Sequence, residues 1–128
     1  MAENIHFLLS NKAFKHIKRY PRSEQVRILN MIRTKVYGFV YHNDTRFLKQ
    51  DHYFSKMGTF DSTIYYIRLD LHNRAIISVD EDPIFDETRV NILSICNHDN
   101  LQREIKGIMQ SLYQKMINDT SYEEEDAE

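Results

Sequence analysis

The segment from Ile64 to Val79 limits the possible folds more than any other part of the chain. It contains two runs rich in β-branched and aromatic residues, Ile-Tyr-Tyr-Ile and Ala-Ile-Ile-Ser-Val, separated by polar turn residues. This pattern predicts two antiparallel strands, Thr63–Leu69 and Arg74–Val79. Arg68 lies near the end of the first strand and Arg74 begins the second. Because a guanidinium group matches phosphate oxygens, two arginines on a rigid sheet indicate a possible grip on an RNA backbone.

Each arginine also has a purely structural interpretation. Arg74 is equally typical of a surface residue beside a turn, and Arg68 of a partner for Asp70 or for a helix carboxylate. The two arginines share a face of the sheet only if the loop between the paired strand ends has an odd number of residues. The sequence leaves both alternatives open.

The N-terminal third predicts a strand followed by two helices. Ile5–Leu9 is a short apolar run, and the cap residues Ser10 and Asn11 then predict a helix over Lys12–Tyr20 that ends before Pro21. A second helix, Ser23–Tyr41 with Ser23 as its cap, completes an αα-hairpin. Its expected apolar stripe comprises Val26, Leu29, Ile32, Val36, Phe39 and Val40.

Residues 42–52 read as a loop with possible strand character near Phe47-Leu48, and Tyr53–Met57 as a further short strand. After the central hairpin, Asp80–Pro83 predicts a turn, with Ile84-Phe85 as an apolar anchor in the connection that follows. Arg89–Cys96 predicts a strand. Asp99 or Asn100 then caps a last helix with apolar positions Leu101, Ile105, Ile108, Met109, Leu112 and Met116.

This order predicts an α+β fold. We expect an antiparallel sheet of three to five strands, the N-terminal αα-hairpin packed on one face, and a C-terminal helix. Residues 1–118 should form a single domain and residues 119–128 an acidic tail, disordered by its composition, since five of the last six residues are acidic. A tail that folds back over a basic surface is the alternative. The tail also explains the net charge of −2, because the rest of the chain is mildly basic.

Composition excludes several classes of protein. No apolar run approaches the roughly 20 residues that span a bilayer, so no membrane partner is expected. The start of the chain lacks the pattern of a signal peptide. Cys96 is the only cysteine, which excludes an internal disulfide and favours a cytoplasmic location. No Cys/His spacing predicts a zinc site, and no cofactor is expected.

Several segments, in order, resemble the RelE/ParE superfamily of toxins. Phe7–Pro21 looks like its first strand and helix, and Leu93–His98 like its last strand. Between them, its middle strands are matched by Phe54–Gly58, Tyr66–Arg68 and Arg74–Val79. The resemblance covers roughly residues 4 to 104 and rests on the order of these segments, because no single motif is highly specific.

The resemblance implies a RelE-like fold and a small cytoplasmic toxin held by a cognate antitoxin protein. Many members of the superfamily cut mRNA on the ribosome by metal-independent attack of a 2′-hydroxyl, and the ParE branch blocks DNA gyrase without cutting RNA. Three functions therefore stay open: an mRNA endoribonuclease, a non-catalytic toxin that blocks a protein target, and an inactive domain that only binds a partner.

By the same resemblance, Arg74 would clamp the scissile phosphate, and Arg68 would close the preceding strand beside it. His98 follows the last strand, where ribonuclease members place a catalytic basic residue or histidine, and an imidazole can move a proton near neutral pH. Some of those members carry a tyrosine near this position, whereas Asp99 and Asn100 follow here. From their residue types, substrate-binding candidates are Lys49, His52 and Lys56.

Overall fold

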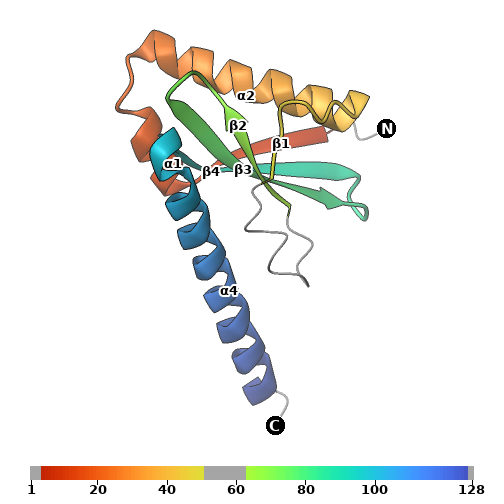
Figure 1. The fold of residues 1–128 in the computed structure, drawn as a ribbon. Helices are drawn as coiled ribbons and strands as arrows, with labels where there is room; N and C mark the ends of the chain where they lie inside the picture. The colour runs from red at the N-terminus through yellow and green to blue at the C-terminus, as the bar shows by residue number, and fades with distance from the viewer. Residues whose placement is uncertain (1–3, 51–62, 127–128) are drawn as a thin grey trace.

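The structure, a computed structural model, describes residues 4–50 and 63–126. In this part of the chain the fold is α+β, with three α-helices and one four-stranded mixed sheet (Figure 1). The strands are β1 (Asn4–Leu9), β2 (Ile64–Arg68), β3 (Asn73–Asp82) and β4 (Glu87–Asn97). The helices are α1 (Asn11–Ile17), α2 (Arg22–His42) and α4 (Leu101–Asp126), and a short 3₁₀ helix η1 (His98–Asn100) precedes α4.

The strands lie in the order β1-β4-β3-β2. The predicted central hairpin is confirmed as β2 and β3, and β4 pairs antiparallel with β3. The expectation of a wholly antiparallel sheet is wrong, because β1 pairs parallel with β4, Asn4 opposite Glu87. A parallel pair needs a long connection, and here the chain between the two strands includes α1, α2 and the hairpin. The residue pattern of β1 carries no information about its direction.

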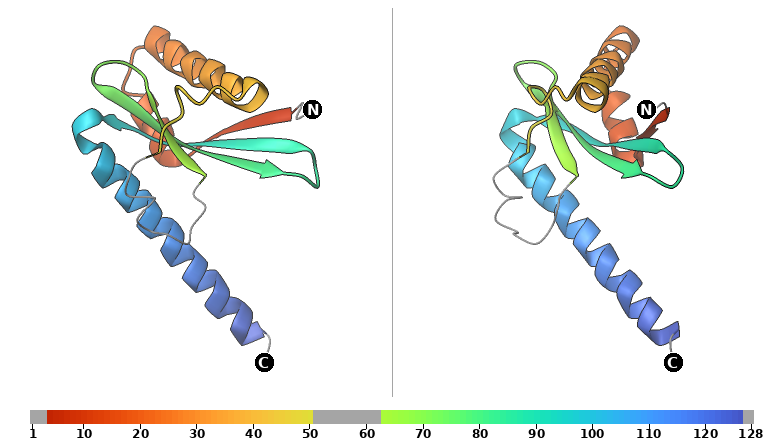
Figure 2. Two further views of the ribbon diagram at one scale, coloured as in Figure 1. Left: turned by 45° about the vertical axis from the view of Figure 1, so that its right-hand side comes forward. Right: turned by 90° about the vertical axis from the view of Figure 1, so that its right-hand side faces the viewer.

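The two N-terminal helices pack on one face of the sheet, as predicted, and the C-terminal helix covers part of the other face. On the first face, α1 and α2 bury residues such as Ile17 and Ile32 against Ile77 and other alternate strand positions. On the second face, the start of α4 packs on Ile76, the neighbour of Ile77 in β3. Successive strand residues point to opposite faces, so the sheet separates two layers of core. In both views of Figure 2 the sheet lies between α2 and α4, and the far end of α4 extends away from it.

The helix boundaries differ from the predicted ones for local reasons. The Ser10 cap is confirmed, since its hydroxyl accepts a hydrogen bond from the Ala13 amide. The first helix ends at Ile17 rather than Tyr20, because the chain tightens there: Tyr20 donates to the Ile17 carbonyl. Pro21, not Ser23, is the N-cap of α2, consistent with a proline φ preset for the start of a helix.

The last part of the sheet also needs corrections. Strand β3 continues to Asp82, so Asp80–Pro83 is not the turn; the turn spans residues 83–86. Ile84 and Phe85 do not anchor the connection, because they are 85% and 69% exposed at the hairpin tip. The Asp82 carboxylate accepts from both of their amides and so shapes the turn.

Asn97 caps the 3₁₀ helix η1 that leads into α4, because its side chain accepts from the Asp99 amide. The prediction that Asp99 or Asn100 caps the last helix itself stays a prediction. Helix α4 then runs to Asp126, so its bounds include most of the expected acidic tail. The division at residue 118 stays a prediction. The expected strand Tyr53–Met57 lies outside the described residues.

Candidate functional site

The register of β2 and β3 answers the question left open by the sequence. Arg68 and Arg74 lie directly opposite each other in the ladder, so their side chains share a face of the sheet. The Asp70 carboxylate fixes the turn between them by accepting from the His72 and Asn73 amides, both at 2.8 Å. Asp70 also lies 3.7 Å from Arg27, so the ion pair considered for it with Arg68 is replaced by this one.

Arg74 is held rigidly by the same turn. Arg74 is only 8% exposed. Its Nη1 donates to the Asp70 carbonyl at 2.8 Å and to the Asn73 carbonyl at 3.1 Å. Among the described residues, these are the hydrogen bonds that the guanidinium makes. A guanidinium has five donors, so Nε and Nη2 stay available to a ligand. The position of this charge is therefore set before any ligand arrives.

Arg68 and Arg74 line a pocket of about 420 Å³ together with side chains from four other parts of the chain. We call it the basic pocket. It is lined by Lys35, Arg46, Phe47, Lys49, Tyr66, Arg68, Arg74, His98 and Leu101. Four residues singled out from the sequence thus meet in one place: Lys49, Arg68, Arg74 and His98. The other two candidates, His52 and Lys56, lie outside the described residues.

The charge in the basic pocket is strongly positive. Of its five lysines and arginines, Arg46 is neutralised by a bidentate contact with Asp44, and these hydrogen bonds lower the pKa of Asp44 to about 2. Within residues 4–50 and 63–126, none of the ion pairs involves the other four. Like charges directly opposite in a sheet destabilise it. The fold therefore accepts a cost at Arg68 and Arg74 that a bound anion would relieve.

Lys35 brings a charge from α2 to this site. Its ammonium donates to the Arg68 carbonyl at 2.9 Å, and burial, followed by the charge of Arg68, lowers its pKa. The ammonium also lies 4.9 Å from the centre of the Phe47 ring, a distance typical of a cation–π contact. Lys35 is thus fixed by its neighbours, although a lysine on a helix gave no signal in the sequence.

The segment after α2 adds an aromatic wall to the basic pocket. Lys49 and Tyr66 exchange backbone hydrogen bonds of 3.1 and 2.8 Å, so residues 47–49 lie against the edge of β2. Leu48 points into the core, and its neighbours Phe47 and Lys49 point outward into the pocket. Phe47 and Tyr66 therefore line the pocket next to its positive charges, and the Arg46 guanidinium lies 5.0 Å from the centre of the Phe47 ring. Aromatic rings beside cations suit a base attached to a phosphate.

His98 reaches the basic pocket from the end of β4. Its backbone amide donates to the His72 carbonyl at 2.6 Å, which ties the end of β4 to the β2–β3 turn. The imidazole is largely exposed, with Nδ1 3.5 Å from a carboxylate oxygen of Asp99. Asp99 is 90% exposed at its side chain, so solvent screens this contact. The ring can therefore turn toward a ligand in the pocket.

No family model, no curated protein and no solved structure matches this chain. Among the described residues, no group of three or more His, Cys, Asp and Glu side chains could hold a metal ion. In the same part of the chain, no helix combines the length and the apolar character needed to cross a membrane. The basic pocket, in which four of the five cationic side chains form no ion pair among the described residues, has the charge that an anion-binding site on an α+β domain requires.

Proposed function

We propose that this chain is the toxin of a type II toxin–antitoxin system, with a RelE-like arrangement, and that it cleaves mRNA in the basic pocket without a metal ion. The supporting observation is the convergence of Arg68, Arg74, Lys35 and Lys49 around one cavity that also contains His98. A phosphodiester flanked by bases matches this set of groups, because it needs positive charge and aromatic faces at the same place.

The reaction requires three contributions from the protein. The RNA must be held so that its 2′-oxygen lies in line with the bond to the 5′-oxygen, which leaves as the new 2′–P bond forms. Arg74, fixed by its turn, and Arg68 would stabilise the negative charge that grows on the phosphate oxygens. His98 would carry one of the two protons, either from the 2′-hydroxyl or to the 5′-oxygen. The products are a 2′,3′-cyclic phosphate and a free 5′-hydroxyl.

Cleavage of mRNA by the purified protein tests this function. We expect cuts in a translating extract and products that end in a 2′,3′-cyclic phosphate and a 5′-hydroxyl, because the 2′-hydroxyl and not a metal-bound water is the nucleophile. Induced expression should arrest growth of the host cell. Intact mRNA in both naked and translating form, or products that end in a 3′-hydroxyl and a 5′-phosphate, would show that the assignment is wrong.

An apolar groove on the other side of the molecule favours a second function, binding of a protein partner. The groove, of about 360 Å³, lies between the edge strand β1 and α2 and is lined by Phe7, Leu8, Leu9, Leu29, Asn30, Arg33 and Ile92. Leu8 is 53% exposed and Leu29 38%. We assign this groove to the antitoxin. If cleavage fails, the same groove supports a non-catalytic toxin that blocks a protein such as gyrase, or an inactive partner-binding domain.

Co-expression with a neighbouring reading frame tests the partner assignment. We expect a stable complex after affinity purification, and Leu29→Glu should disrupt it because a charge would be buried in an apolar contact. Thr34→Glu, an exposed change on the same helix, is the matched control and should leave the complex intact. Equal recovery with both variants would place the partner elsewhere.

A further inference from the structure

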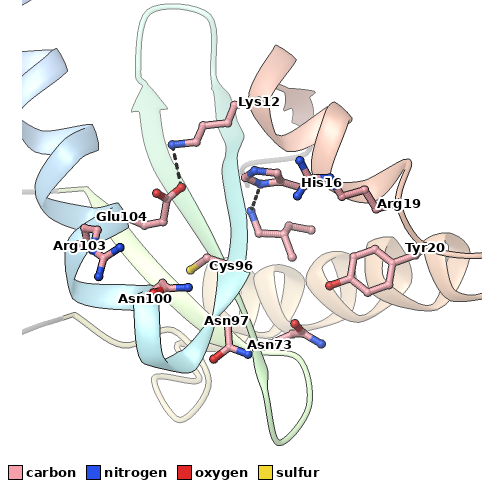
Figure 3. A pocket seen from close by; sticks show the side chains of 11 residues that line it. Lys12, His16, Arg19, Tyr20, Asn73, Cys96, Asn97, Asn100, Arg103 and Glu104 are labelled. Carbon is pink, nitrogen blue, oxygen red and sulfur yellow. Dashed lines mark hydrogen bonds and ion pairs between the residues drawn. The ribbon is translucent and has the colours of Figure 1, made fainter.

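A second pocket, of about 400 Å³, lies where β4 extends beyond β1 (Figure 3). We call it the edge pocket. It is formed between α1, the start of α4 and the last residues of β4. Side chains that carry the argument below are Arg19 and Arg103, Tyr20, and the three amides Asn73, Asn97 and Asn100.

Where β4 extends beyond β1, side chains of α1 and of its N-cap take the place of a neighbouring strand and form hydrogen bonds with the β4 backbone. The Ser10 hydroxyl donates to the Leu93 carbonyl at 2.9 Å, and the Ile95 amide donates to Nδ1 of His16 at 3.1 Å. Burial, then the charge of Arg19, lowers the pKa of His16. Because Nδ1 accepts from the Ile95 amide, the ring proton of His16 is on Nε2, and the side chain satisfies the backbone at the edge of β4. Burial also raises the pKa of the Cys96 thiol to about 11, so no thiolate is available there.

Two guanidinium groups define the charge of the edge pocket. Lys12 is neutralised by Glu104 at 2.7 Å, and Glu104 also accepts from the Ser94 hydroxyl. In the part of the chain that the structure describes, no ion pair involves Arg19 or Arg103. Figure 3 shows them on opposite sides of the pocket, with the amides along its lower rim. Two cations, amides and a phenol ring suit a nucleotide, whose base edge and phosphate need such groups.

The edge pocket and the basic pocket share one wall. Three pairs of consecutive residues divide between them, with the first of each pair in the edge pocket and the second in the basic pocket: Asn73 and Arg74, Asn97 and His98, Asn100 and Leu101. The pockets lie on the two sides of the end of the sheet, because successive strand residues such as Asn73 and Arg74 point to opposite faces. An RNA strand that passes around this end could place linked nucleotides in both pockets.

We propose that the edge pocket is a second subsite for the same single-stranded RNA, holding a nucleotide next to those in the basic pocket. Arg19 and Arg103 contact its phosphate, and the asparagine amides and Tyr20 contact its base. The inference rests on the proposed function, because it extends the RNA strand from the basic pocket. A strand is favoured over a free nucleotide because consecutive residues at the end of the sheet line the two pockets, so the two binding sites adjoin each other around this end.

Binding of labelled RNA oligonucleotides of two lengths tests the subsite. The probes are a trinucleotide, which we expect to occupy the basic pocket alone, and an octanucleotide, which is long enough to reach both pockets. The variant Arg19→Gln/Arg103→Gln should bind the octanucleotide about a hundredfold more weakly, roughly tenfold for each guanidinium–phosphate interaction removed. Its affinity for the trinucleotide should not change. The matched control Arg22→Gln/Arg89→Gln removes the same charge at residues that line neither pocket and should bind both probes as the wild type does.

A second variant guards against a purely structural effect. Asn100→Asp keeps the size of an exposed side chain and places a negative charge in the edge pocket, so it too should weaken octanucleotide binding alone. Equal affinity of the double variant and the wild type for the octanucleotide would overturn the subsite. A parallel decrease for both lengths would also overturn it, since the arginines would then act only through overall charge.

Arg74→Ala separates this inference from the proposed function. Suppose that Arg74→Ala abolishes cleavage, while the edge-pocket variants prefer the octanucleotide over the trinucleotide as strongly as the wild type does. In that case only the subsite is wrong. If the edge-pocket variants lose this preference for the octanucleotide while the wild type cuts no RNA, the nuclease assignment is wrong and the subsite stands. If the wild type binds neither oligonucleotide, both proposals are wrong.

Discussion

Arg74→Ala should lower the rate of RNA cleavage about 100- to 1000-fold and relieve growth arrest on induced expression. Removing one preorganised donor to a developing oxyanion typically has an effect of this size, and the hydrogen bonds to Asp70 and Asn73 preorganise this guanidinium. Arg74→Lys should recover only part of the rate, because an ammonium keeps the charge but not the fork. Cleavage rates at saturating RNA measure the difference.

Controls distinguish an effect on the reaction from an effect on folding. Arg89→Ala removes an exposed arginine at the opposite end of the same sheet and should cleave normally. His98→Ala should reduce cleavage as Arg74→Ala does, whereas Asp99→Ala should not, since Asp99 is exposed and outside the basic pocket. Circular dichroism should show that all variants are folded. Unchanged cleavage in folded Arg74→Ala and His98→Ala proteins would place the catalytic site elsewhere.

Ile32→Ala should cost about 2–5 kcal/mol of the free energy of unfolding, because it leaves a cavity in the core between α2 and the sheet. Ile32 is fully buried at the middle of α2. A domain of ordinary size has only about 5–15 kcal/mol of stability in total, so the variant should unfold at a clearly lower denaturant concentration. Urea unfolding followed by circular dichroism measures the change.

The matched control is Leu29→Ala, on the same helix and with the same number of atoms removed. Leu29 is 38% exposed, so its truncation should cost much less than that of Ile32. Equal destabilisation by the two changes would mean that α2 packs on the sheet through a different face. The comparison is made without a partner protein, since Leu29 lines the apolar groove.

The sequence predicts the elements of this fold better than their arrangement. Apolar residues that recur every two residues, as in a strand, or every three to four, as in a helix, locate the central hairpin, β4 and the two N-terminal helices. They misplace part of the stripe on α2, where Val26 and Leu29 are exposed and Ile28 is buried. All three are apolar, so hydrophobicity alone cannot choose between two faces that differ by one residue. The direction of β1 and the position of α4 depend on contacts between distant segments, which a local pattern does not contain.

For the candidate site too, the sequence predicts residues that are close in the chain better than residues that only the fold brings together. Arg68 and Arg74 are neighbours along the hairpin, so the sequence could point to both, although only the observed register places them on one face. Lys35, Arg46 and Phe47 had no such signal, because α2 and the segment after it reach the pocket only through the packing of the whole domain. Tyr66 illustrates the limit: alternation makes one of Tyr65 and Tyr66 a core residue, yet Tyr66 both packs below α4 and lines the pocket.

The parallel pairing of β1 with β4 has a consequence for the order of events during synthesis. Ser10 and Leu93, which join the two strands at their ends, are 83 residues apart in the chain. Contacts between segments so distant form late, because a large loop must close first. Strand β1 is synthesised before β4, the only strand with which it pairs among the described residues, and therefore stays unpaired until β4 has been made. During this time the backbone of β1 is open to pairing with other chains, so prompt pairing with β4 is a condition for correct folding in the cell.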